Sequence, residues 1–225
     1  MDWDVIDLGT MAYAAALKRQ RERNAAVSLG EAKPALLLVE HEPVITISHR
    51  KGVREHLLAS EQRLAELGID VQDTDRGGDI TYHGPGQLVA YPILRLHDHG
   101  LNLGRYMRLL EEAVAATLAL LGIAGVTEPG ATGVWVKNPQ GATSKICAMG
   151  VRVRKNTTMH GLALNVMTDL SHFETIDPCG LGRRPVTSLK QMLGERCPSM
   201  AGIKSALAEQ LASALDRSTL SGARR

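Results

Sequence analysis

The chain has 225 residues, of which 44% are hydrophobic and 22% charged, and its formal net charge is +2. This composition is typical of a globular protein that buries its own core without disulfides or metals, so we expect a single domain over 1–225 with a frayed tail at 217–225. Two tryptophans, four tyrosines and one phenylalanine are too few for a base-stacking surface, and no nucleic-acid partner is expected.

The sequence also argues against targeting and metal-binding segments. Its N-terminus lacks the basic and apolar regions of a secretory signal, and no apolar run is long enough to cross a bilayer. Cys147, Cys179 and Cys197 are odd in number and lack the pair spacing of metal sites, which indicates reduced thiols. We therefore expect a cytoplasmic protein without membrane association or bound metal, in which one cysteine could be reactive.

The first half of the chain alternates helical and extended patterns. Residues 10–26 have the apolar spacing of an amphipathic helix, and 35–48 read as two strands around a turn. A short helix is expected over 56–67, with Gly68 at its C-terminal end. A glycine-rich loop then leads into an apolar strand at 88–94.

The second half predicts a long helix, a run of strands and a last helix. Asn102 can cap a helix over 103–121. Residues 131–166 alternate short β-type runs with turns, which predicts three or four antiparallel strands, and a final helix is expected over 199–215. Helices around β-hairpins favour an α+β fold, with a largely antiparallel or mixed sheet flanked by helices.

The stretch RGGDITYHGPGQ (76–87) is the densest in glycine and polar residues. Gly77 and Gly78 could let backbone N–H groups approach a ligand closely, although an ordinary tight connection between strands would need similar residues. His83 is the residue here that could donate a hydrogen bond to a carbonyl or polarise it. A lone histidine is as often structural.

Lys145 lies in TSKICAMG, whose pattern is that of a strand. On a regular strand the lysine would lie on one face, with Ile146 and Ala148 on the other. A lysine in that position needs a partner, or its stem covers apolar surface while its head stays in water.

Cys179 lies in IDPCGLG, between a proline and a glycine that leave its sulfur uncrowded. A nucleophilic thiol needs its pKa lowered from about 8.5, and a neighbouring cation does this. Lys145, Arg183 and Arg184 are the candidates, and a buried, inert thiol is the alternative.

Three other arrangements carry less chemistry. Cys147 and Cys197 are interpreted as structural, and the His-Asp-His triplet at 97–99 as a surface loop, because adjacent residues point apart. A Cys-His protease could use His160 or His172 as its base, but no protease signature surrounds Cys179.

Taken together, RGGDITYHGPGQLVAYPI, GVWV, SKICAMGVRV, MHGLALNV, DPCGLG and VTSL resemble the lipoyl(octanoyl) transferase family in order and spacing. The opening DLGTMAYAAAL and the segment LLLVEHEPVITI extend the resemblance over nearly the whole chain. It implies the α+β fold of biotin and lipoate protein ligase catalytic domains, in which a sheet and the glycine loop form an acyl-binding tunnel.

The resemblance also implies roles for individual residues. Cys179 corresponds to the acyl-accepting nucleophile and Lys145 to its catalytic partner. The acyl-binding positions are Arg76, Gly77, Gly78, Asp79, Ile80, Thr81, Tyr82, His83, Ala148, Met149, Gly150, Gly161, Leu162 and Ala163. The chain departs from the family pattern at Leu162, where phenylalanine is frequent, and at Cys147, where alanine is frequent.

The implied reaction transfers an octanoyl group from octanoyl-acyl carrier protein to a lysine ε-amine of a lipoyl domain, through a Cys179 thioester. The acceptors would be E2 subunits of 2-oxoacid dehydrogenases and the glycine cleavage H protein, in the first step of endogenous lipoate biosynthesis. Backbone N–H groups near Gly77 and Gly78, or near Cys179, are the candidates to hold the oxyanion, with His83 as a further candidate to assist them. Basic residues such as Arg152, Arg154 and Lys155 would meet the acidic carrier protein. A monomer without a cofactor is expected.

Two alternatives remain. An ATP-dependent lipoate or biotin protein ligase would share the fold and the lysine, but it has no need of the DPCGLG cysteine, and the GRGRxG loop of biotin ligases is not found. A non-catalytic acyl-binding protein is disfavoured because both Lys145 and Cys179 are present.

Overall fold

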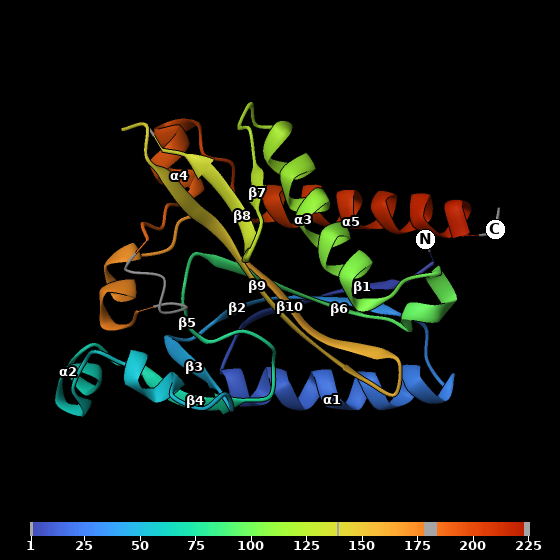
Figure 1. The fold of residues 1–225 in the computed structure, drawn as a ribbon, viewed down its shortest axis with the longest axis horizontal. Coiled ribbons are helices and arrows are strands. Elements are labelled where there is room, and N and C mark those ends of the chain that lie inside the picture. Colours follow the sequence, from blue (N-terminus) through green and yellow to red (C-terminus); the bar gives the residue numbers. More distant parts are fainter. Residues whose placement is uncertain (1, 139, 178–183, 223–225) are drawn as a thin grey trace.

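The computed structural model describes residues 2–138, 140–177 and 184–222. These residues form a seven-stranded sheet and a three-stranded sheet, with helices packed on both faces of the larger one (Figure 1). The mixed sheet flanked by helices confirms the predicted α+β class.

The large sheet is mostly antiparallel. Its strands, in spatial order, are β1 (Asp4–Met11), β2 (Ala35–His41), β6 (Gln87–Ile93), β10 (Thr157–Asn165), β9 (Thr143–Arg154), β8 (Ala131–Lys137) and β7 (Val126–Glu128). The pair β1–β2 is parallel, and the remaining neighbours are antiparallel.

The small sheet consists of β4 (Asp70–Thr74), β3 (Val44–Ser48) and β5 (Ile80–His83). The strand β3 is parallel to β4 and antiparallel to β5. Although β2 and β3 are separated by only two residues, they belong to different sheets, so the turn between them is not a hairpin. The small sheet has its own apolar cluster, in which Ile45 and Ile47 pack on Tyr82 and Phe173.

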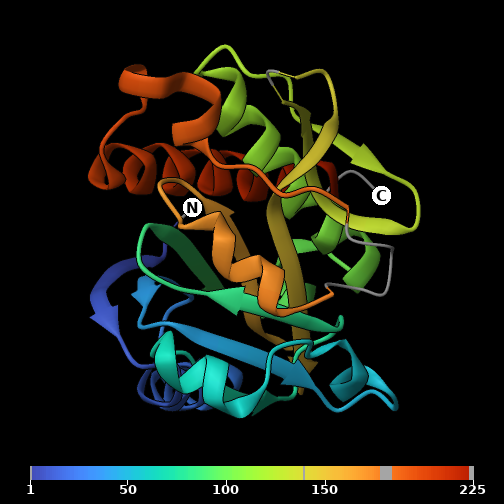
Figure 2. The same ribbon diagram turned by 90° about the vertical axis from the view of Figure 1, so that its left-hand side faces the viewer.

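Helices cover the large sheet on its two faces. The helix α1 (Tyr13–Leu29) lies on one side, and α3 (Leu103–Ala119) and α5 (Met200–Gly222) lie on the other (Figures 1 and 2). Two shorter helices are α2 (Glu61–Glu66) and α4 (Leu189–Leu193). In β2, Leu36 and Leu38 pack toward α3 and α5 while Leu37 and Val39 pack toward α1, because side chains alternate along a strand.

The long helix predicted after Asn102 is confirmed. The side chain of Asn102 accepts a hydrogen bond from the Arg105 amide, and Gly122 follows the helix with a φ of 75°. Tyr106, Leu110 and Val114 are fully buried at helical spacing, so the amphipathic pattern positions the helix on the sheet.

Other element boundaries differ from the prediction. Strand β1 occupies the start of the first expected helix, which begins only at Tyr13. The helix expected over 56–67 is reduced to α2, capped by Ser60. Strand β4 and helix α4 were not predicted. The last helix, expected to end at 215, continues as α5 to Gly222. Among the described residues, no helix is both long enough and apolar enough to span a membrane.

Candidate active site

Three neighbouring strands of the large sheet form the floor of a cavity. Ala148 on β9 pairs with Ala163 on β10, which pairs in turn with Val89 on β6. Further along, Gly150 on β9 pairs with Gly161 on β10. Small side chains in this part of the sheet leave space above the backbone that larger residues would fill.

A β-bulge in β9 sets the direction of Lys145. Trp135 pairs with Lys145 and Val134 pairs with Cys147, so Ile146 is an extra residue in β9. As a result, Lys145 and Ala148 both line the cavity, whereas Ile146 and Cys147 lie in the core below α3. The expectation that Ala148 would share a face with Ile146 is therefore wrong, because a regular strand was assumed.

Gly133 on β8 allows this bulge. Its φ is 122°, which residues with a Cβ rarely adopt, and a Cβ there would lie 2.4 Å from the backbone oxygen of Cys147. Its amide donates a hydrogen bond to Glu111 Oε1 at 3.0 Å, which ties the strand to α3. A side chain at this position would push β8 away from the bulge.

The glycine-rich loop forms the roof of the cavity. Strand β8 pairs with β9 only as far as Cys147. Beyond this residue the glycine-rich loop lies along the edge of β9, and the Gly77 amide donates a hydrogen bond to the Val151 oxygen at 2.9 Å. A Cβ on Gly150 would lie 2.4 Å from the Gly77 oxygen, so the loop approaches the strand at van der Waals contact. Arg76 Nη2 donates to the Thr46 backbone oxygen at 2.9 Å and holds the loop on the small sheet.

Floor and roof enclose a cavity of about 420 Å³, within the range of small-molecule sites. Apart from Tyr82, every predicted acyl-binding residue lines it, as does Lys145. Tyr82 lies in the apolar cluster of the small sheet, where its hydroxyl is 2.7 Å from His172 Nδ1. Tyr82 thus supports β5 from the side away from the cavity.

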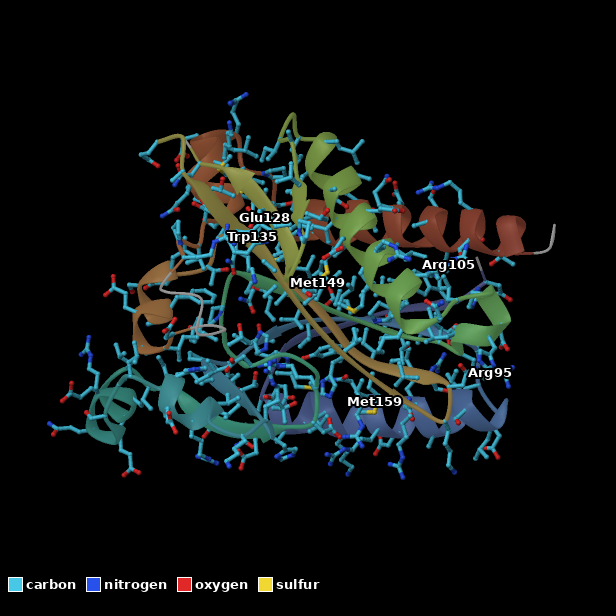
Figure 3. The ribbon with its side chains drawn as sticks, viewed as in Figure 1. Arg95, Arg105, Glu128, Trp135, Met149 and Met159 are labelled. Atoms are coloured by element: carbon cyan, nitrogen blue, oxygen red, sulfur yellow. The ribbon has the colours of Figure 1, made fainter. Side chains whose placement is uncertain are left out.

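Lys145 lies next to an aromatic ring and a second cation. Its Nζ is 4.6 Å from the ring centroid of Trp135, and Arg184 Cζ is 3.7 Å from the same centroid. Arg184 also binds Glu128 through two hydrogen bonds of 2.6 and 3.0 Å. Glu128 on β7 and Trp135 on the neighbouring strand β8 are labelled in Figure 3. Lys145 and Arg184 therefore lie at the same aromatic ring, and both are candidates to influence a thiol here.

Cys179 and Arg183 lie outside the described residues, but the chain on both sides of them is fixed. The Lys145 amide donates to the Pro185 oxygen at 2.9 Å, and the Thr187 amide donates to the Lys145 oxygen at 2.9 Å. On the other side, the Asp177 amide donates to the His56 oxygen at 2.8 Å. Pro185 and Thr187, which follow Cys179 and Arg183 in the chain, are therefore bonded directly to the bulge that carries Lys145.

Sequence reasoning missed a cluster of aromatic and histidine rings on the β6 side of the cavity. Tyr13, His83, Tyr91 and His160 line the cavity, and His41 lies behind them. The rings of Tyr13 and His83 are stacked with centroids 6.4 Å apart, and His41 is 5.7 Å from His83 and 6.0 Å from Tyr91. Aromatic residues are rare in this chain, so Tyr13 and Tyr91 could have been singled out from the sequence as candidate site residues.

The hydrogen bonds of His83 make it an acceptor in the cavity, whereas the sequence suggested a hydrogen-bond donor. Gln87 Nε2 donates to the Tyr82 backbone oxygen and to Asn165 Oδ1, so its Oε1 must accept the hydrogen bond from His83 Nδ1, which measures 2.7 Å. Burial lowers the pKa of His83 to about 3, so the ring is neutral and its Nε2 carries no proton. His83 therefore offers an acceptor to the cavity and cannot donate to an oxyanion.

His160 is strained and oriented by a carboxylate. Its φ is 57° in the middle of β10, a backbone conformation that persists only where the surrounding structure holds the residue in place. Its Nε2 lies 2.8 Å from Asp75 Oδ1. The hydrogen bond with His160 lowers the pKa of Asp75 to about 2, and burial lowers the pKa of His160. Arg152 Nη1 is 2.8 Å from the other oxygen of Asp75.

The other predicted features are placed as follows. Cys147 is fully buried, and burial raises the pKa of its thiol to about 12. Burial also raises the pKa of Cys197, which is partly exposed. Arg154 and Lys155 are exposed at the β9–β10 turn. No group of three potential metal ligands occurs among the described residues, and 97–99 form a 3₁₀ turn at the surface.

The fold and the cavity define a class of proteins. Residues 12–212 match the family model of the lipoyl protein ligase A/B catalytic domain. A bipartite lipoate protein ligase from Thermoplasma acidophilum has a TM-score of 0.73 at 20% identity, covering 100% of this chain and 91% of that one. A biotin protein ligase from Aquifex aeolicus has a TM-score of 0.58 at 14% identity, covering 95% and 71%. The chain belongs to the lipoyl protein ligase A/B catalytic-domain family.

Curated relatives narrow the class. An octanoyltransferase from Chloroflexus aurantiacus is 48% identical over 205 residues, covering 91% of this chain and 90% of the relative. One from Bacteroides fragilis is 44% identical over 219 residues, covering 95% and 96%. The predicted resemblance is confirmed, and the chain is an enzyme of the acyltransferase class.

Proposed function

We propose that the chain transfers an octanoyl group from acyl carrier protein to a lysine of lipoyl domains, through a thioester on Cys179. The observation that carries this proposal is Lys145, which lines an apolar cavity from a bulge that is hydrogen-bonded to the segment following Cys179. High identity to octanoyltransferases supports the same substrate class.

The first half-reaction forms the acyl-enzyme. The Cys179 thiolate attacks the carbonyl carbon of the acyl-carrier thioester, a new carbon–sulfur bond forms, and the bond to the phosphopantetheine sulfur breaks. The departing thiolate takes up a proton. Lys145, as an ammonium, stabilises the Cys179 thiolate before attack.

The second half-reaction forms an amide. The lysine ε-amine of the lipoyl domain attacks the Cys179 thioester, the carbon–nitrogen bond forms, and the Cys179 thiolate leaves. Neutral Lys145 helps to remove the proton that the amine loses. The energy is supplied by the thioester, so no nucleotide is consumed.

Candidates for the oxyanion site differ in availability. The Gly77 amide is already bonded to Val151. The Gly78 amide has no hydrogen-bond partner within the described ranges, and its φ of 99° is one that glycine tolerates. Gly78 is therefore the better candidate on the glycine loop, beside the amides near Cys179.

The test is acylation without ATP or acceptor. The purified chain, its Cys179→Ala variant and its Lys145→Ala variant are each mixed with octanoyl-acyl carrier protein, and intact mass is recorded. We expect one octanoyl adduct on the wild type, none on Cys179→Ala, and slow formation on Lys145→Ala. A wild type that is never acylated, but acylates lipoyl domains from octanoate and ATP, would show an ATP-dependent ligase instead.

Carrier-protein docking is tested separately. Arg152 is paired with Asp75, which leaves Arg154 and Lys155 as the exposed cations of this turn. Charge reversal at both should raise KM for the carrier about tenfold at low salt and flatten its salt dependence. The matched control reverses the exposed Arg63 on α2, and equal KM changes in both variants would refute specific docking.

The remaining expectations belong to the same proposal. The acceptors are E2 subunits of 2-oxoacid dehydrogenases and the glycine cleavage H protein, and the enzyme acts in the cytoplasm as a monomer. Analytical ultracentrifugation of the chain, alone and with a lipoyl domain, measures its oligomeric state.

A further inference from the structure

The β6 side of the cavity carries two unprotonated imidazole nitrogens. One is His83 Nε2, whose ring is held by Gln87 in the neutral form described above. Two backbone oxygens fix this assignment, because Gln87 donates to Tyr82 and Asn165 Nδ2 donates to the Thr187 oxygen at 3.0 Å. Neither amide can be turned around without opposing oxygen to oxygen. His83 Nε2 has no hydrogen-bond partner among the described residues.

The second nitrogen belongs to His160. Its Nε2 faces the carboxylate of Asp75, which only accepts hydrogen bonds, so Nε2 carries the ring proton. The ring is neutral at neutral pH, which leaves Nδ1 as a bare acceptor. Within the described parts of the chain, no group donates a hydrogen bond to this Nδ1. The His160 side chain lines the cavity and is only 2% exposed.

Tyr91, which packs against His160, supplies no free donor. His41 Nδ1 lies 3.0 Å from the Met11 backbone oxygen and must donate to it, so the neutral ring accepts at Nε2. The Tyr91 hydroxyl is 2.7 Å from that nitrogen and donates its proton there. Its ring packs edge-on against His160 with centroids 6.3 Å apart. We call His83, Tyr91 and His160 the acceptor wall.

The acceptor wall lies away from Lys145 both across the strands and along them. Lys145 is on β9 and Tyr91 is on β6, with β10 between them, so two strand spacings of roughly 10 Å separate them across the sheet. Ala90, next to Tyr91, pairs with Leu162, which pairs with Met149, so the wall is also offset from Lys145 by roughly 15 Å along the strands. The floor between is Ala148, Ala163 and Val89. An acyl chain that starts near Lys145 thus crosses an apolar floor before it reaches polar groups.

We propose that the acceptor wall determines which acyl chains the enzyme accepts. It excludes saturated chains longer than octanoyl, and it admits chains longer than octanoyl when they carry a hydrogen-bond donor at their far end. A saturated chain that reaches the wall displaces water from two acceptors and offers no proton in return, which is unfavourable. A terminal hydroxyl or thiol replaces that water. This inference rests on the proposed octanoyl transfer and names its specificity determinant.

The first experiment uses the wild-type chain alone. Initial rates of Cys179 acylation are measured by intact mass with octanoyl-, decanoyl-, dodecanoyl- and 10-hydroxydecanoyl-acyl carrier protein. We expect kcat/KM to fall about tenfold or more from octanoyl to decanoyl, and the terminal hydroxyl to recover about tenfold. A hydroxyl that gives no recovery, or a decanoyl rate equal to the octanoyl rate, overturns the inference and leaves the proposed function intact.

Variants then locate the effect. His83→Phe keeps an aromatic ring and removes the bare nitrogen, and His160→Asn tolerates the positive φ while shortening the side chain. Both should raise the decanoyl-to-octanoyl rate ratio about tenfold, with His97→Phe at the surface as the matched control. Thermal melting identifies variants that fail to fold. Folded variants with an unchanged ratio overturn the assignment, whereas a wild type that no octanoyl thioester acylates overturns the proposed function itself.

Discussion

Individual side chains in this cavity are defined by their hydrogen-bond partners more than by their type. His83 and His160 are both neutral, yet one is protonated at Nδ1 and the other at Nε2, because a Gln87 oxygen holds the first and an Asp75 carboxylate the second. The glycine loop and the place of Lys145 beside it could be predicted from the sequence, since glycines and motif spacing are local signals. The tautomers could not, because they depend on contacts among five separate segments.

Thiol reactivity should differ sharply between the cysteines. Native protein treated with iodoacetamide at pH 8 should be alkylated at Cys179 first, since it is proposed to be a thiolate, and should leave Cys147 unmodified because burial raises the pKa of its thiol to about 12. Peptide mass spectrometry reads the sites. Cys147 should react only after urea unfolding, and its early alkylation in the native protein would contradict this account.

Elements in this fold were predictable where their signals are local and were missed where they depend on neighbours. The helix after Asn102 has a cap and an apolar stripe of its own, and was predicted closely. Strand β1 is an edge strand with exposed Asp4 and Val5, so it lacks the apolar pattern of a buried strand. The bulge at Ile146 was invisible because it is produced by the pairing of β9 with β8.

Gly133 should be critical for that bulge. Gly133→Ala is expected to lower the free energy of unfolding by about 3 kcal/mol, because the Cβ meets a backbone oxygen at a φ that disfavours it, and to reduce acylation by displacing Lys145. Gly130→Ala is the control, since its φ is also positive, at 80°, but nothing lies within 4 Å of the new Cβ. Its cost should be about 1 kcal/mol. Equal costs in urea titrations would contradict the steric explanation.

The turn of the β9–β10 hairpin can be made more stable by substitution. Lys155 and Asn156 form its two-residue loop with φ values of 48° and 62°, as in a type I′ turn, which prefers Asn-Gly. The double variant Lys155→Asn, Asn156→Gly should raise the urea midpoint at constant m, by about 1 kcal/mol of stability. Lys155→Val should lower it. A double variant less stable than the wild type would show that the turn is not strained.

The whole molecule should lose stability on mild acidification. Burial lowers the pKa of His41 to about 4 and of His83 to about 3, so the native state keeps both neutral while the unfolded chain binds protons below about pH 6.5. Stability is therefore fully present above pH 6.5 and declines as pH falls toward 4, by up to about 1.4 kcal/mol per pH unit for each histidine. Urea unfolding at pH 7, 6 and 5 measures the slope.

A variant identifies the histidines responsible. His41→Gln should reduce the pH slope of stability by about one proton, while His97→Gln on the exposed 3₁₀ turn should leave it unchanged. Stability that does not change between pH 7 and 5 in the wild type would mean that these rings gain protons without unfolding the protein.

The floor of the cavity belongs to the large sheet and its roof to the small sheet, and each sheet has its own apolar cluster. Between them run directional polar contacts: Tyr13 with Thr74, Asp75 with His160 and Arg152, and Gly77 with Val151. One apolar cluster also joins the two sheets, because Val44 of β3 packs with Met159 of β10 and with Tyr13 and Leu17 of α1. The roof is therefore held over the floor by directional hydrogen bonds and ion pairs together with apolar packing, so a substitution in either kind of contact changes the shape of the acyl cavity from a distance.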